Sequence, residues 1–116
     1  MDQDELTILT LMEWARSHLD QRLSLDVLAG RAFMSRRTFC RRFRQVAGVS
    51  PGEWVLREKV ALAQELLEGP GLTVDRIAGR AGFGSDVIMR RHFRRIVGCS
   101  PTEYRDRLLS SPAVPV

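Results

Sequence analysis

Two segments of the chain, residues 35–47 and 85–97, carry rows of arginine side chains that could bind a chain of phosphates. If the first segment is helical, the side opposite its apolar residues presents Arg36, Arg37, Cys40, Arg41 and Arg44, with Arg42 at the edge. The second presents Asp86, Val87, Arg90, Arg91 and Arg94, with Arg95 near the edge. A planar guanidinium can bind a phosphate, or two acceptors on one nucleic-acid base, through paired N–H donors. The rows therefore predict an anionic partner.

Arginine is almost the only basic residue of the chain. Seventeen of the 18 basic residues are arginine, Lys59 is the single lysine, and nine of the arginines lie on the two segments. A solvated helix face normally mixes charges of both signs, whereas these rows contain one acid, Asp86. This pattern favours a nucleic-acid surface over arginine that merely covers solvated helices. The alternative is a protein-interaction module whose arginine-rich helices bind an acidic partner.

The residue types that catalysis or metal binding would need are sparse. Cys40 and Cys99 lie far apart without a CxxC motif, and neither His18 nor His92 has a carboxylate or cysteine at ligand or triad spacing. We therefore expect no catalytic residue, no metal site and no cofactor, and we do not expect an enzyme. The acidic N-terminus is unlike a signal peptide, and no run of 18 apolar residues occurs, so we expect a cytoplasmic protein without a membrane span.

Composition adds that the basic charge belongs to the later part of the chain. The 116 residues are 44% hydrophobic and carry a net charge of +4, which suits a compact globule with an anionic partner. Residues 1–23 carry five acids and two arginines, and residues 24–116 carry nine acids and sixteen bases. The two arginine segments thus lie in a region of net charge +7.

The elements that position these segments are two copies of one unit. Residues 24–57 and 73–107 match at an offset of 49 up to Ala32 and Ala81, and at an offset of 50 beyond, because the second copy has one extra residue in a turn. Such a repeat predicts two similar lobes. In each copy a capping serine or threonine opens a short helix, and a serine, Ser35 or Ser85, opens the arginine-bearing helix that a glycine ends. We therefore predict that each lobe is a helix-turn-helix.

Repeated start signals define the remaining helices. SPGE at 50–53 and SPTE at 100–103 combine a serine cap, a proline at the first helical position and a glutamate at the third. They predict helices from about Pro51 to Glu68 and from Pro101 to about Leu109. The fold class is then all-α, with two homeodomain-like lobes and about seven helices. We divide the chain into a first lobe with an N-terminal helix (1–50), a linker helix (51–69), a second lobe (70–110) and a disordered tail (111–116).

Dimensions suggest how two such lobes would bind double-stranded DNA. A helix-turn-helix unit places its second helix in the major groove, and successive major grooves on one side of a duplex are about 34 Å apart. A linker helix of 18 residues is about 27 Å long at 1.5 Å per residue. We therefore predict that helices 35–47 and 85–97 enter successive major grooves.

At this point the sequence resembles the AraC/XylS-type bacterial transcription regulators, over about residues 6–109. The most specific passage is IAGRAGFGSDVIMRRHFRRIVGCSPTEYR at 77–105, and LAGRAFMSRRTFCRRFRQVAGVSPGEW at 28–54 matches the first unit. The resemblance implies sequence-specific DNA binding near promoters in the bacterial nucleoid, contact with RNA polymerase, and a sensory domain upstream. The residues WVLREKVALAQELLEG at 54–69, followed by GFGS at 82–85, resemble the branch with a PfpI/ThiJ-like upstream domain. We expect this chain to be either an excised C-terminal domain or a stand-alone regulator, and favour the former.

The resemblance also assigns positions to the DNA contacts. Base-reading positions fall on Arg37, Cys40 and Arg41 in the first unit and on Asp86, Val87, Arg90 and Arg91 in the second. Positions nearer the phosphates fall on Arg36, Arg44, Arg94 and Arg95.

Three of these residues have a second interpretation. Cys40 offers only a weak donor and could be a small neutral residue, and Val87 could contact a thymine methyl or simply be exposed. Asp86 could accept from cytosine N4, cap its helix, or pair with a nearby arginine.

Overall fold

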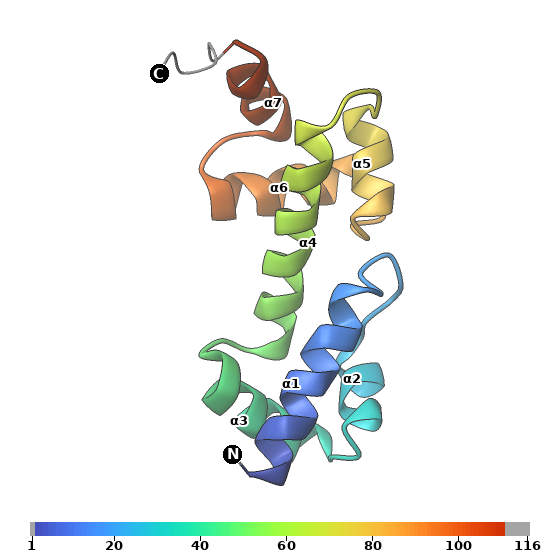
Figure 1. The fold of residues 1–116 in the computed structure, drawn as a ribbon, viewed down its shortest axis with the longest axis vertical. Helices are drawn as coiled ribbons and strands as arrows, with labels where there is room; N and C mark the ends of the chain where they lie inside the picture. The colour runs from blue at the N-terminus through green and yellow to red at the C-terminus, as the bar shows by residue number, and fades with distance from the viewer. Residues whose placement is uncertain (1, 111–116) are drawn as a thin grey trace. The chain divides into compact units, whose positions relative to one another are not determined.

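The computed structural model describes residues 2–110. Within this range the chain forms seven α-helices and no strand (Figure 1), which confirms the all-α prediction. The helices are α1 (Gln3–Arg16), α2 (Leu25–Arg31), α3 (Arg36–Ala47), α4 (Pro51–Glu68), α5 (Val74–Arg80), α6 (Asp86–Val97) and α7 (Pro101–Ser110). None of them is long and apolar enough to cross a membrane. The tail predicted for residues 111–116 lies outside the described residues.

The chain divides into two compact units at a point inside α4. The first unit ends at Glu58 and the second begins at Lys59, so α4 contributes residues to both. The start and end predicted for this helix, Pro51 and Glu68, are those observed. Because the linker helix is shared, each unit is a three-helix arrangement completed by a part of α4.

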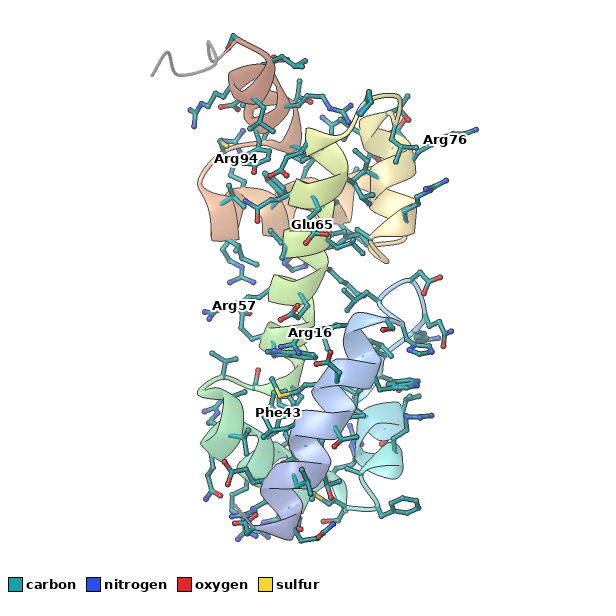
Figure 2. All side chains as sticks on the ribbon, in the orientation of Figure 1. Arg16, Phe43, Arg57, Glu65, Arg76 and Arg94 are labelled. Atoms are coloured by element: carbon teal, nitrogen blue, oxygen red, sulfur yellow. The ribbon has the colours of Figure 1, made fainter. Side chains whose placement is uncertain are left out.

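In unit 1, α1 and α2 pack on the inner face of α3. Phe39 and Phe43, one turn apart on α3, are fully buried in the core of this unit, and Phe43 is labelled in Figure 2. Their rings lie 5.5 Å apart, and the Phe43 ring meets Trp54 of α4 edge to face at 5.7 Å. The α1 stripe that covers them consists of Ile8, Leu11, Met12 and Ala15. Burial of these apolar side chains fixes which side of α3 faces solvent.

Unit 2 repeats this core with its own residues. Met89 and Phe93 of α6 are fully buried, and Ile77 and Ala78 of α5 are at most 1% exposed. The Phe93 ring meets Tyr104 edge to face at 5.6 Å, as Phe43 meets Trp54 in unit 1. The residues that α4 adds to this core are Val60, Ala63 and Leu67. Trp54 and Tyr104, which each follow the glutamate of an SPxE motif, thus pack in the same way in the two units.

The second helix of each unit begins and ends where its cap residues predict. Ser35 Oγ accepts a hydrogen bond from the Thr38 N–H at 3.2 Å, and Ser85 Oγ accepts one from the Ile88 N–H at 3.2 Å. Each helix stops at a glycine with positive φ, at +79° for Gly48 and +97° for Gly98. A side chain with a Cβ is strained in that conformation, so glycine ends the helix at little cost.

The turn that precedes each of these helices has the same hydrogen-bond pattern in both units. Phe33 N–H donates to Gly30 O and Met34 N–H to Ala29 O, while in unit 2 Gly82 N–H donates to Gly79 O and Phe83 N–H to Ala78 O. Phe33 therefore corresponds to Gly82, and both have a positive φ, +55° and +85°. The extra residue of the second turn is Gly84, also with positive φ.

Candidate nucleic-acid interface

The solvent-facing side of α3 carries every residue that the sequence assigns to the first interface. Arg36, Arg37, Arg41 and Arg44 are exposed and Cys40 is half-buried, on the side of the helix away from Phe39 and Phe43. A shallow surface pocket of about 450 Å³ lies there, lined by Arg37, Cys40, Arg41, Arg44, Ser50 and Pro51. Pro51 is the first residue of α4 and Ser50 precedes it, so the pocket lies at the N-terminus of this helix, where the helix dipole places partial positive charge. Three guanidinium groups and a helix N-terminus together favour an anion.

Carboxylates of unit 1 form ion pairs with only some of the α3 arginines. Arg36 Nε lies 3.2 Å from Asp26, and the edge residue Arg42 lies 2.7 Å from Asp2 and 3.3 Å from Asp4. For residues 2–110, no carboxylate oxygen is within 4.0 Å of the Arg37, Arg41 or Arg44 guanidinium. The three central arginines of α3 thus keep their full charge toward solvent.

The Asp2 and Arg42 pair joins the start of α1 to α3. Asp2 caps α1 by accepting the Glu5 N–H at 2.7 Å, and Arg42 also donates to Gln45 at 2.9 Å. The backbone hydrogen bond from Glu5, followed by the hydrogen bond from Arg42, lowers the pKa of Asp2 below its ordinary value. The hydrogen bond with Asp2 in turn raises the pKa of Arg42. Arg42 is therefore a structural residue of unit 1.

On α6 the predicted residues are also directed to solvent. Val87 is 71% exposed, and Arg90, Arg91, Arg94 and Arg95 are exposed. Two of these arginines are paired with acids: Arg90 Nε lies 3.4 Å from Asp86, and an Arg94 guanidinium nitrogen (labelled residue in Figure 2) donates to Glu103 at 3.0 Å. The α6 face therefore presents less unpaired positive charge than the α3 face.

Asp86 has one of the structural roles that its sequence position left open. Ser85 caps α6, and the Asp86 carboxylate one residue later pairs with Arg90 one turn along the helix. Glu103 holds Arg94 from α7, and the Ser100 hydroxyl and then Arg94 lower the pKa of Glu103 by hydrogen bonding. These two carboxylates orient two of the four arginines on α6.

Sequence reasoning missed the pairs that join different helices. Asp26 with Arg36, Asp2 with Arg42 and Glu103 with Arg94 are brought together only by the tertiary fold. Sequence spacing indicates only pairs within one helix, such as Asp86 with Arg90, since residues four apart are neighbours on a helix.

Two further cations of unit 2 donate hydrogen bonds to backbone carbonyl oxygens. Arg105 donates to the carbonyl oxygens of Leu67 and Leu72 at 3.3 and 2.6 Å, which places its charge at the C-terminus of α4. Lys59 donates from Nζ to Gly82 O in the turn before α6 at 2.8 Å, and burial lowers the pKa of this lysine. Both residues fix the backbone that positions α6.

Comparison with known proteins bears on this arrangement. A family model described as a helix-turn-helix domain matches residues 28–107. Regulatory protein SoxS of Salmonella typhimurium is 35% identical over 101 residues, and the match covers 87% of this chain and 94% of SoxS. An HTH-type transcriptional regulator of Mycobacterium tuberculosis is 47% identical over 78 residues, covering 67% of this chain and 30% of that protein. Although it covers nearly all of SoxS, the chain spans less than half the length of the first curated relatives that it matches, which include this mycobacterial regulator.

Among solved structures, the fold is similar to the DNA-binding domain of AdpA, a global transcriptional factor whose structure was solved in complex with a target DNA. The TM-score is 0.85 with 44% identity, covering 91% of this chain and 97% of the AdpA domain. Residues 2–110 form seven helices in two repeated helix-turn-helix units. This fold, the family model over residues 28–107 and these relatives lead to one assignment. The chain belongs to the AraC-type family of helix-turn-helix transcription regulators.

Proposed function

We propose that the chain binds double-stranded DNA in a sequence-specific manner and thereby regulates transcription. The observation that carries this proposal is the likeness to the AdpA DNA-binding domain, 44% identical over nearly its whole length and solved on a target DNA. The exposed arginine rows of α3 and α6 support it independently, because their charge complements a phosphate backbone.

In this proposal α3 and α6 each enter a major groove. Arg37 and Arg41 lie one turn apart on α3 and read base edges, since an arginine can bind guanine O6 and N7 together. Cys40 lies between them and contributes shape more than a hydrogen bond. In α6 the corresponding base-reading positions are Asp86, Val87, Arg90 and Arg91. Arg36, Arg44, Arg94 and Arg95 contact phosphates.

The Asp86 and Arg90 pair gives α6 a more restricted recognition surface than α3. A guanidinium that is already bonded to a carboxylate is held in one orientation, and the carboxylate can itself accept from cytosine N4. We infer that α6 contributes discrimination among sequences. The free guanidinium groups of α3 contribute more of the salt-dependent affinity.

The test is selection of duplexes from a random pool, followed by fluorescence anisotropy with the selected and a scrambled duplex at two salt concentrations. Specific binding predicts affinities for the selected duplex at least 10³-fold above the scrambled one, within the range typical of such proteins. A module that binds acidic proteins through its arginines would enrich no sequence and would bind both duplexes alike. That second result would refute the proposal.

A further inference from the structure

Phe33 occupies a position in unit 1 at which neither its backbone nor its side chain favours a phenylalanine. Its φ is +55°, in the left-handed region, and its side chain is 95% exposed. A bulky residue is strained at positive φ, and an exposed aromatic ring gains nothing from packing within the fold. The stability of unit 1 therefore does not explain the presence of Phe33.

The second unit shows what the same turn looks like without this side chain. Gly82 fills the equivalent position with the same hydrogen-bond pattern and a φ of +85°. Glycine accepts that conformation without strain and exposes no apolar surface. The two units thus differ in one respect that the turn itself does not require, which is the phenyl ring.

Beside Phe33 lies an open groove on the surface of unit 1. It has a volume of about 400 Å³ and is lined by Gln3, Leu6, Thr7, Thr10, Leu11, Trp14, Arg31 and Phe33. Leu6 is 49% exposed, so apolar surface borders the groove from α1 as well as from the turn. Arg31 is the only charged residue among those that line it. We call this feature the Phe33 groove.

In unit 2 a lysine side chain reaches the corresponding turn. The buried residues Ile8, Leu11 and Ala15 of α1 have the spacing of Val60, Ala63 and Leu67 of α4, so Thr7 corresponds to Lys59. Lys59 reaches the turn and donates to Gly82 O at 2.8 Å. The shorter Thr7 leaves the groove of unit 1 open toward Phe33.

Arg31 supplies the groove with a directed positive charge. Its guanidinium carbon lies 3.7 Å from the centroid of the Trp14 ring, a stacked position that holds the group in place. A stacked guanidinium keeps its N–H donors at the edge, where a carboxylate can bind two of them. Across the part of the chain that is described, no acid lies within 4.0 Å of Arg31. The groove therefore complements an apolar group next to a carboxylate.

We propose that the Phe33 groove docks a segment of a partner protein that presents an apolar side chain beside an aspartate or glutamate. Phe33 and Leu6 contact the apolar side chain and Arg31 binds the carboxylate, over the Trp14 ring. This inference goes beyond DNA binding, because none of the residues of the Phe33 groove belongs to the arginine rows. It gives unit 1 a second binding surface, separate from the arginine row of α3.

The experiment selects phage-displayed random 12-residue peptides on the immobilised chain, and measures synthetic copies of the winners by fluorescence anisotropy. We expect the winners to share an apolar residue within one helical turn of an acidic residue. Phe33→Gly should weaken their binding at least tenfold, as a central aromatic anchor does. Arg31→Gln should lower the peptide affinity by the same factor as replacing the peptide's acidic residue by its amide. Combining both changes should cause no further loss of affinity.

Controls separate docking from folding and from DNA binding. Leu109→Ala removes another exposed apolar side chain, 79% exposed and in unit 2, and should leave peptide binding unchanged. Phe33→Gly should raise the melting temperature, because glycine relieves the positive φ, and Phe33→Asn serves as a second variant that tolerates this conformation. Affinity for the selected duplex should stay the same in both variants.

Three results would overturn the proposal: an absence of any shared motif among the peptides, peptide binding that survives Phe33→Gly, or a loss of DNA affinity in that variant with peptide binding intact. The last would assign Phe33 to the DNA interface instead. If the chain failed to bind any duplex while the peptides bound as expected, the proposed function would fail and the docking surface would stand.

Discussion

Arg94 on α6 donates a hydrogen bond to Glu103 on α7 at 3.0 Å, whereas the equivalent glutamate in unit 1, Glu53, lies 3.4 Å from Arg57 on its own helix. The two units share the sequence SPxE, yet one glutamate faces the second helix of its unit and the other pairs along its own helix. Arg44, the counterpart of Arg94, consequently has no carboxylate within 4.0 Å among the described residues. Equal sequence motifs thus leave the two arginine rows with different available charge.

Replacement of Glu103 by Gln should strengthen binding to any duplex. The amide can still occupy the third helical position, but it releases Arg94 and removes a negative charge near the phosphates. An exposed ion pair is weakened by solvent and screened by salt, so we expect a gain of about two- to fivefold at low salt. Fluorescence anisotropy titration of the scrambled duplex measures this gain in affinity. Glu53→Gln is the matched control, and an equal gain in both variants would show that only net charge matters.

Arg41 and Arg44 should respond differently to truncation. Both are exposed on α3 and neither has a described carboxylate partner, so alanine breaks no ion pair in the free protein. Arg41→Ala should cost about 1–3 kcal/mol on the selected duplex and relax the preference at one base pair. Arg44→Ala should weaken all duplexes alike and reduce the slope of log K against log salt by about 0.9. Identical losses on selected and scrambled duplexes for both variants would remove the base-reading role of Arg41.

Cys40 offers a chemical probe of the α3 face. It is half-buried in the pocket between Arg37 and Arg44, whereas Cys99 is 3% exposed in unit 2. N-ethylmaleimide should therefore modify Cys40 first, and the added group should block entry of α3 into a groove. Mass spectrometry with and without the selected duplex should show slower modification when DNA is bound. Cys40→Ser should keep its affinity after treatment, and unchanged affinity of the alkylated native chain would place Cys40 outside the interface.

The pair of Asp2 and Arg42 should make the stability of the protein pH-dependent in acid. The pKa of Asp2 is lowered in the folded state, so this carboxylate stabilises the fold above its ordinary value of 3.8 and loses that contribution as the pH falls through the lowered pKa. Asp2→Asn keeps a side-chain oxygen for the Glu5 N–H but lacks the charge that Arg42 binds. Urea unfolding should therefore show a gap between the native chain and this variant at neutral pH that closes in strong acid. A constant gap at all pH values would contradict this account.

Much of the fold could be predicted because its determinants are local. Ser35, Ser85, Gly48 and Gly98 set the ends of α3 and α6 through contacts within four residues, and the burial of Phe39 and Phe43 follows from their spacing. Once those ends and that inner face are known, the solvent-facing arginines follow. Their individual contacts with DNA remain predictions.

Contacts between helices could not be predicted in the same way. Asp2 and Arg42 are separated by 40 positions in the sequence, and many arginines were equally available to Asp2 until α1 packed on α3. Phe33 shows a different limit. A position with left-handed backbone conformation is normally recognised in a sequence because it holds a glycine, and this position holds a phenylalanine. The match of its turn to that of Gly82 became visible only through the backbone hydrogen bonds.

The division of α4 between two units has a consequence for how the chain folds. Starting a helix is unfavourable because several residues must be ordered for the first hydrogen bond, whereas extending it is easy. When unit 1 orders Pro51–Glu58, the residues from Lys59 onward extend an existing helix instead of starting one. Val60, Ala63 and Leu67 are thereby already on a common face before α5 and α6 pack against them. A single helix start is thus shared by two hydrophobic cores, which couples their folding.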